Sequence, residues 1–234
     1  MTHLANPWAM HDNMHMHRKH LLRPARLGML VFAAGILFAT LSSFAQKADV
    51  NVNMFGAFPS TATGPAPNVN GEAFSPVRQT ADPSAGFRIG GRYVFSPVFG
   101  LEVNFGYSRA TQHFTGNREQ SGVVYSHAKP FTIDYVATAP NLHHGFRPFV
   151  LAGAGLISYN ISSFSALPAR PEKIPVFEYG GGADYHPASF PNIMFLRVQY
   201  RGLVGHAPDY LLPYLATSKL INIAEPQVGL VFKF

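Results

Sequence analysis

The 234-residue sequence contains no cysteine, so disulfides and cysteine-bound metals are excluded. Charged residues are scarce as well, at 13% of the chain, whereas 47% of the residues are hydrophobic. A disordered chain has the opposite balance. The longest apolar stretch runs from Leu27 to about Leu41, and mean hydropathy is +0.05, which argues against a bundle of membrane helices. Aromatic residues (13%), 21 glycines and 19 prolines are typical instead of short strands joined by turns.

The amino-terminal stretch has the three-part layout of a secretory signal peptide. Four basic residues precede the apolar stretch, and Ser43 and Ala45 place small residues at the −3 and −1 positions of a cut after Ala45. We therefore predict a signal peptide at residues 1–45 and a mature domain at residues 46–234. The alternative is an uncleaved membrane anchor, for which the apolar stretch is slightly short.

Much of the positive charge belongs to this leader. Residues 1–45 hold four of the 18 basic residues and one of the 12 acidic residues, so the mature chain has a formal charge of 14 − 11 = +3. The sequence gives no reason to expect nucleic-acid binding.

Eight segments of the mature chain alternate apolar and polar residues with the period of a strand. We predict strands at residues 49–58, 87–95, 99–109, 131–138, 149–159, 177–185, 193–203 and 227–234. Small residues on both faces leave the phase of 149–159 open, and Pro226 is expected to mark a bulge or a strand start. The connections alternate between long and short, with residues 110–128 predicted to be one long polar loop.

Nearly every predicted strand has one apolar face and one face that carries the charges. In a soluble barrel the apolar face points inward, and in a membrane barrel it points outward. The last strand, Val228–Phe234, has an apolar face that no later residue can cover. We therefore predict an all-β fold, an eight-stranded antiparallel transmembrane β-barrel with short periplasmic turns and four long outer loops, in the bacterial outer membrane. A soluble ligand-binding barrel is the outside alternative.

The tight turn after Phe95 predicts a register in which Phe95 opposes Phe99, Tyr93 opposes Leu101, Ile89 opposes Phe105 and Arg92 opposes Glu102. Charged residues of the inner face then need partners, because a lone buried charge is costly. The predicted interior ion-pair network consists of Arg88, Arg92, Glu102, Asp134, Glu178, Asp184, Arg197 and Arg201. The alternative is a water-filled lumen with solvated charges; eight strands leave little room beyond the side chains, which favours a plugged interior.

The chain resembles the small outer-membrane β-barrel family, the OmpA/OmpX-like group, as a barrel domain only. The resemblance is carried by the terminal segment Val228–Phe234, by the hairpin from Gly86 through Tyr107, and by Arg147-Pro148-Phe149-Val150-Leu151-Ala152-Gly153-Ala154-Gly155. It implies that Phe234, with Phe232 and Leu230 behind it, is the signal read by the barrel-assembly machinery during insertion. From the resemblance to a barrel domain only, we do not expect the peptidoglycan-binding function of larger members.

The sequence gives little indication of catalytic, metal-binding or phosphate-binding residues. His143 and His144 are neighbours in an extended chain and make a poor chelate. Ser126 and His127, the candidate pair of a lipid-modifying hydrolase, do not face each other on a strand either. The strand glycines Gly90-Gly91 and Gly180-Gly181-Gly182 suit close packing better than phosphate binding. We expect no catalytic residue, no metal and no cofactor.

These observations predict a structural or surface-interaction role of the adhesion type, with outer loops that could meet an extracellular ligand and a wall in contact with outer-membrane lipid. A narrow passive pore and an outer-membrane lipid-modifying hydrolase are the alternatives. The apolar segment Tyr210–Leu215 is open to three interpretations, namely interfacial anchoring or strand extension, which we favour, a lumen cap, or a partner-binding patch.

Overall fold

The computed structural model describes residues 48–65, 76–116, 121–139, 145–162 and 168–234. Eight long strands form the wall of a barrel: β1 (Ala48–Pro59), β4 (Ser84–Val94), β5 (Phe99–Thr115), β6 (Gly122–Thr138), β7 (Phe146–Ile161), β8 (Glu172–Tyr185), β9 (Met194–His206) and β10 (Leu220–Lys233). Two short strands, β2 (Ala62–Gly64) and β3 (Val77–Ala81), and the 3-10 turn η3 (Pro213–Leu215) lie in the connections. Within the described residues, no helix is long and apolar enough to cross a membrane.

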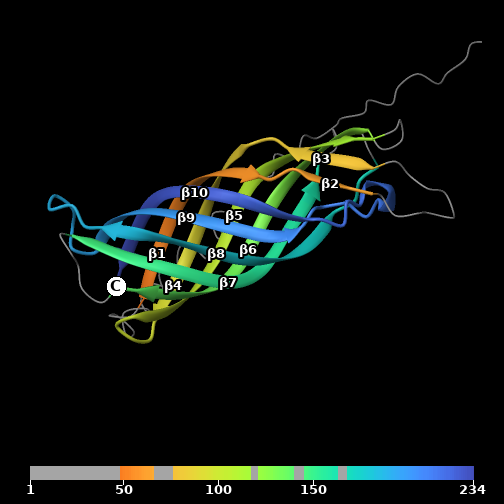
Figure 1. Cartoon of the computed structure of the whole chain (residues 1–234). Coiled ribbons are helices and arrows are strands. Elements are labelled where there is room, and N and C mark those ends of the chain that lie inside the picture. Colours follow the sequence, from red (N-terminus) through yellow and green to blue (C-terminus); the bar gives the residue numbers. More distant parts are fainter. Residues whose placement is uncertain (1–47, 66–75, 117–120, 140–144, 163–167) are drawn as a thin grey trace, which may run out of the picture. The chain divides into compact units, whose positions relative to one another are not determined.

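Each long strand pairs antiparallel with its sequence neighbour, and β1 pairs with β10, which closes the sheet (Figure 1). A closed sheet leaves no unpaired edge in its wall. The barrel has two ends, which we call the turn end, where β1 begins and β10 finishes, and the loop end, which carries β2, β3 and η3. The predicted eight-stranded antiparallel barrel is confirmed.

The register of the first hairpin is also confirmed. Strand β4 opposes β5 with Tyr93 against Leu101, Arg92 against Glu102 and Ile89 against Phe105. At the turn, the Phe95 N–H donates to the Phe99 carbonyl at 3.2 Å. The match follows from strand geometry, since a one-residue slip would exchange the inner and outer faces of a whole strand.

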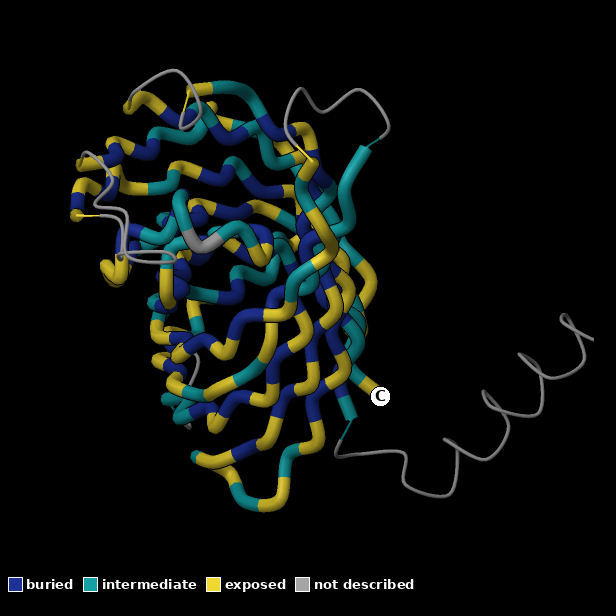
Figure 2. Tube along the Cα trace, turned by 90° about the vertical axis from the view of Figure 1, so that its right-hand side faces the viewer, coloured by how far each residue is buried: buried dark blue, intermediate teal, exposed yellow. Residues whose placement is uncertain are grey.

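The apolar faces point outward. Exposed and buried residues alternate along the wall strands (Figure 2). The exposed set includes large hydrophobic side chains from every strand, such as Met54, Ile89, Phe105, Phe131 and Val198, whereas the buried set of the middle barrel is mainly polar or charged. Water would penalise this arrangement, and lipid favours it.

The strands are longer than predicted at the loop end. Residues 110–128, predicted to be a loop, instead continue β5 to Thr115 and begin β6 at Gly122. Strand β3 pairs with this extension of β5, and β2 pairs with β3. The polar composition of the segment misled the prediction, because an extension beyond the membrane does not need an apolar face.

Pro226 marks neither a bulge nor a strand start, contrary to the prediction. Strand β10 runs through it, and Pro226 opposes Tyr200 on β9. On the other side, the pairing of β1 with β10 lapses at Gly56 and Ala57 and resumes in the same register at Phe58, which opposes Ala224. The missing proline N–H is therefore accommodated by local loss of ladder pairing.

Candidate functional site

The middle of the lumen is filled by charged side chains that contact one another. All eight residues of the interior set that the sequence singled out lie here, and their side chains are at most 2% exposed. The structure adds two members, Glu225 and Lys233. Five carboxylates (Glu102, Asp134, Glu178, Asp184, Glu225) then face five cations (Arg88, Arg92, Arg197, Arg201, Lys233) in one continuous network.

Arg201 is the centre of this network. Its Nη1 lies 3.0 Å from Asp134 Oδ2 and 2.9 Å from Glu178 Oε1, and its Nη2 contacts Glu102. These three carboxylates stand on three different strands, β5, β6 and β8. A single guanidinium thus joins β9 to the opposite wall across the lumen.

The two ends of the network extend toward the two ends of the barrel. Arg88 binds Glu178 at 2.7 Å and Glu225 at 2.5 Å on the loop-end side. On the turn-end side, Arg197 Nε lies 2.7 Å from Asp184, which also accepts a contact from Lys233 Nζ at 3.0 Å. Among these ten groups the formal charges cancel and each has at least one partner of opposite charge, which offsets part of the cost of burying them.

Small residues of the inner face make room for these side chains. A Cβ at Gly153 would stand 2.3 Å from Asp134 Oδ1, and one at Gly90 would stand 2.4 Å from Asn104 Oδ1. Real side chains never approach so closely, so glycine is required there for packing. Burial also shows which residues of β7 face the lumen: Phe149, Leu151 and Tyr159 are buried, whereas Val150 and Leu156 are exposed.

Phe149 belongs to the segment that carries the family resemblance, and its ring contacts two guanidinium groups. The Cζ atoms of Arg92 and Arg197 are 4.9 Å and 4.7 Å from its ring centroid. Cation–π contact of this kind is strongest away from water. The ring therefore stabilises two buried guanidinium groups of the network.

The lumen changes character toward the loop end, where apolar side chains replace the charges. Its core includes Phe114, Val124, Ile157, Tyr159 and Leu203 from the wall strands. Tyr210 and Leu215, from the connection between β9 and β10, are fully buried in the same cluster. Our favoured interpretation of Tyr210–Leu215, as an interfacial anchor or a strand extension, is thus wrong: the segment forms no strand and caps the lumen. We call it the plug.

Polar contacts fix the plug in place. The Tyr210 N–H donates to Glu172 Oε2 at 2.7 Å, and its hydroxyl lies 3.2 Å from Ser126 Oγ. Tyr210 has a φ of +54°, in the left-handed region that a tyrosine seldom adopts. Burial of the ring raises the pKa of Tyr210, so the hydroxyl stays protonated.

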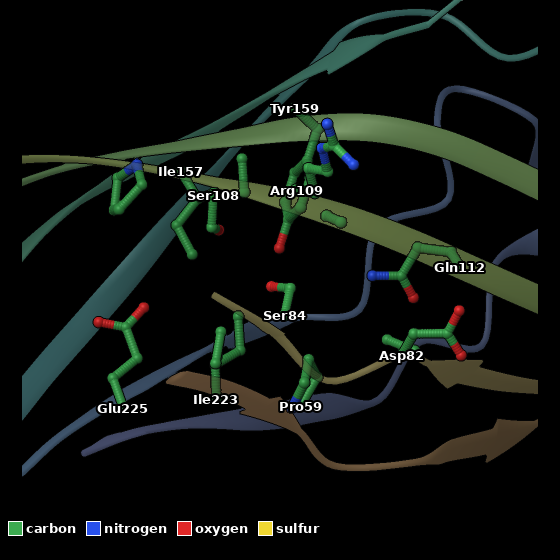
Figure 3. A pocket seen from close by; sticks show the side chains of 15 residues that line it. Pro59, Asp82, Ser84, Ser108, Arg109, Gln112, Ile157, Tyr159, Ile223 and Glu225 are labelled. Atoms are coloured by element: carbon green, nitrogen blue, oxygen red, sulfur yellow. The ribbon is translucent and has the colours of Figure 1, made fainter. Parts of the chain in front are cut away.

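Figure 3 shows a small cavity on the loop-end side of the network. The cavity lies among Ser84, Ser108, Tyr159, Ile223 and Glu225, and its volume of about 20 Å³ suffices for one water molecule. Charged side chains thus pack the middle of the lumen and apolar side chains its loop end, and Val136, Phe149 and Leu151 form a further small apolar cluster.

Ser126 and His127 do not meet. Ser126 is buried and its hydroxyl donates to the Ala110 carbonyl at 2.9 Å. His127 follows on the outer face, where its Nδ1 lies 2.9 Å from the Tyr107 hydroxyl. A serine nucleophile needs its base within hydrogen-bond reach, and this pair lacks that geometry. His143 and His144 lie outside the described residues, among which no group of metal-ligating side chains occurs.

The terminal strand closes the barrel. Leu230 opposes Val52 and Phe232 opposes Val50 on β1, and the Phe234 N–H donates to the Ala48 carbonyl at 2.9 Å. Val231 on the inner face is fully buried, whereas Val228 and Phe234 on the outer face are 50% and 39% exposed. The last residue therefore stands at the rim of the turn end.

Comparison with known proteins identifies the fold. The crystal structure of the outer membrane protein OprG from Pseudomonas aeruginosa matches with a TM-score of 0.57 at 12% identity, over 81% of this chain and 96% of that chain. Neisserial surface protein A matches with a TM-score of 0.48 at 14% identity, over 80% and 97% of the two chains. At such identities the likeness to OprG shows the fold alone, and the second score carries no argument. No curated protein sequence matches the chain.

A family model described as the outer membrane protein beta-barrel domain matches residues 31–234, which include all eight wall strands. The outward apolar faces and the closed antiparallel sheet are what such a domain requires. The chain therefore belongs to the outer membrane protein beta-barrel domain family, which places it in the bacterial outer membrane.

Proposed function

We propose that this protein is a non-conducting outer-membrane barrel that presents its loop end to partners outside the cell. The observation that carries the proposal is the occluded lumen, filled by a balanced charge network and by the plug. Two separate layers of packed side chains weigh against a narrow passive pore. The position of Ser126 and His127 on opposite faces weighs against a hydrolase built on that pair.

The loop end supports an interaction role, because ordered sheet extends beyond the part of the wall that faces lipid. Strand β5 has 17 residues, whereas a tilted strand needs about 9–11 residues to cross a bilayer. Its outer part pairs with both β3 and β6. Such a sheet is a more rigid display surface than single loops would be.

The first test is conductance. The purified protein is reconstituted in planar lipid bilayers, where we expect no discrete current steps. Stable steps in protein-containing bilayers, absent from protein-free ones, would overturn the non-conducting assignment.

The second test addresses surface interaction. Residues 62–81 are replaced by a short Gly/Ser linker, which leaves the direct pairing of β1 with β4 intact. Cells that display the native chain are expected to adhere to immobilised glycans, matrix proteins or other cells more strongly than cells with the variant. Heat-dependent gel mobility verifies that both barrels fold. Equal adherence of cells with the native chain and cells with no barrel would count against the role.

We further propose that Phe234, Phe232 and Leu230 form the signal for the assembly machinery. Deletion of Phe234 removes only the rim residue, so the finished barrel should keep its stability while the amount inserted per cell falls severalfold. A Phe234→Tyr variant is the control, because it keeps a terminal aromatic ring. Normal membrane yield of the truncated chain would count against this role.

A further inference from the structure

The outer wall carries charge at one place only. Among the eight wall strands, every Asp and Glu side chain lies on the inner face, as do the basic side chains of β4, β7, β9 and β10. Three basic residues remain for the lipid-facing side: Arg109 on β5, Lys129 on β6 and Lys173 on β8. We call them the exterior cation patch.

The strand register brings these residues together. Lys129 opposes Ser158 on β7, and Ser158 opposes Lys173 on β8, so the two lysines stand in one row across three strands. Arg109 opposes His127, the residue two positions before Lys129 on the same face of β6. With strands about 4.8 Å apart, the backbone of Lys129 lies within roughly 10 Å of the backbones of the other two, whereas Arg109 and Lys173, three strands apart, lie roughly 16 Å from each other.

The patch lies at a defined position along the strands, at the edge of the apolar belt. The next row toward the turn end consists of Phe105, Phe131, Leu156 and Pro175, all of which are exposed and apolar. Lys129 is two residues from Phe131 on one face of β6, a step of about 7 Å. The patch therefore begins where the apolar belt ends, at the level of lipid head groups, and it does so at the loop end, which the proposed orientation assigns to the outer leaflet.

The surface around Arg109 is hollowed. A depression of about 430 Å³ is lined by Arg109, Thr111, Tyr125, His127 and Ser162. The His127 ring stacks on Tyr107 with centroids 5.5 Å apart, and its Nδ1 lies 2.9 Å from the Tyr107 hydroxyl, which fixes the imidazole on the rim. Hydroxyl groups, an imidazole and a guanidinium in one depression suit a phosphate on a sugar.

Within the described residues, none of the three cations forms an ion pair with a carboxylate. Asp82 lines a neighbouring hollow together with Arg109, but its carboxylate lies 3.0 Å from His113 Nε2. The opposite wall offers no equivalent, since β9 and β10 have no outward-facing lysine or arginine.

We infer that the exterior cation patch binds the phosphorylated sugar head group of a glycolipid of the outer leaflet, whose acyl chains lie along the apolar belt below. The phosphates of such a head group meet cations that span roughly 16 Å of the wall, with no competing exterior carboxylate on the wall strands. The alternative is that the two lysines and the arginine are solvated and bind no ligand. The site lies on the wall, so it is independent of any partner at the loops.

The test uses the full mature chain in detergent, titrated with bisphosphorylated lipid A. The variant Arg109→Gln/Lys129→Gln/Lys173→Gln is compared with Arg78→Gln/Arg170→Gln/Lys219→Gln, which removes the same charge from exposed positions away from the belt. We expect the first variant to bind at least tenfold more weakly than the native protein, and the second to bind within twofold of it. Heat-dependent gel mobility verifies folding of both.

Two further arms identify the ligand. Dephosphorylated lipid A and phosphatidylglycerol should each bind the native protein at least tenfold more weakly than the bisphosphorylated glycolipid, and inorganic phosphate at millimolar concentration should displace it only partly. Equal binding by the two charge variants would overturn the site. Equal binding of phosphatidylglycerol or of dephosphorylated lipid A would overturn the glycolipid as its occupant. Neither outcome bears on conductance or adherence, so the proposed function is judged separately.

Discussion

The middle of the lumen and its loop end are filled by different kinds of side chain. In the middle of the barrel, five carboxylates and five cations fill the space, and every one of them comes from a wall strand. Toward the loop end, apolar side chains of the wall leave a gap that the plug fills from a connection. A charged layer must supply all its partners from fixed positions in the register, whereas an apolar layer accepts any side chain of suitable volume.

This difference determines how substitutions destabilise each part of the lumen. In the network, the loss of one charge leaves others buried and unpaired. In the plug, the loss of one side chain leaves only a cavity, and a connection that is not held by a sheet ladder can partly collapse into it. Five tests, ordered by expected effect, separate these cases.

The largest effect is expected from Arg201→Met, which leaves Glu102, Asp134 and Glu178 without their shared cation. Loss of one partner from a buried ion pair costs about 3–5 kcal/mol of unfolding free energy. Urea unfolding in lipid vesicles, followed by gel mobility, measures it. Lys219→Met, at an exposed position, should cost less than about 0.5 kcal/mol.

A second substitution sharpens this result. Asp134 has its one ion pair in the described network with Arg201. Arg201→Met/Asp134→Asn should therefore regain part of the lost stability, because one unpaired charge disappears. If the double variant is no more stable than the single one, unpaired charge is not the source of the loss.

In the plug, Leu215→Ala should cost about 2–4 kcal/mol, because the side chain is fully buried in the apolar core. Leu211→Ala is the matched control from the same segment, since Leu211 is 58% exposed and should cost less than about 0.5 kcal/mol. The urea assay applies here too, together with the rate of proteolysis within residues 207–219. Similar costs for the two leucines would contradict the buried position of the plug.

A smaller effect is expected from Tyr210→Phe, which keeps the ring and removes the hydroxyl that lies 3.2 Å from Ser126 Oγ. A single hydrogen bond contributes about 0.5–1.5 kcal/mol. Tyr93→Phe, on the exposed outer face, serves as the control. A loss above the range for Leu215→Ala would show that the plug depends on polar contacts and not on burial.

The smallest effect concerns pH. Burial raises the pKa of Tyr210 above its ordinary value of 10.0, so the folded state holds the proton more tightly than the unfolded state does. The resulting stability is fully present below pH 10 and is lost progressively as pH rises above it. Between pH 8 and pH 11, the native protein should lose stability faster than Tyr210→Phe, in which this proton is absent. Parallel curves would exclude Tyr210 as the titrating group.

Much of the fold and of the network was predictable from the sequence, since strand period, register and charge placement are coupled. Once Arg92 opposes Glu102, alternation alone puts Arg88 on the same inner face, and the same reasoning applies on the other strands. The predicted network lacked Glu225, because the last strand was predicted to start after this residue. It also lacked Lys233, although this lysine alternates with the apolar face of the last strand. The ends of β5 and β6 were missed because polar strand beyond the membrane looks like loop.

The sequence by itself determined the period-two alternation, the number of wall strands and which side chains share a face, because these depend only on neighbours along the chain. The tertiary structure alone decided that the plug enters the lumen and that three cations of neighbouring strands lie at the loop-end edge of the apolar belt. Both depend on how far strands slide past each other and on where a connection returns, which are properties of the closed barrel and not of any one segment. The same closure gives the terminal strand its partner, since β10 has β1 beside it only when the circle is complete.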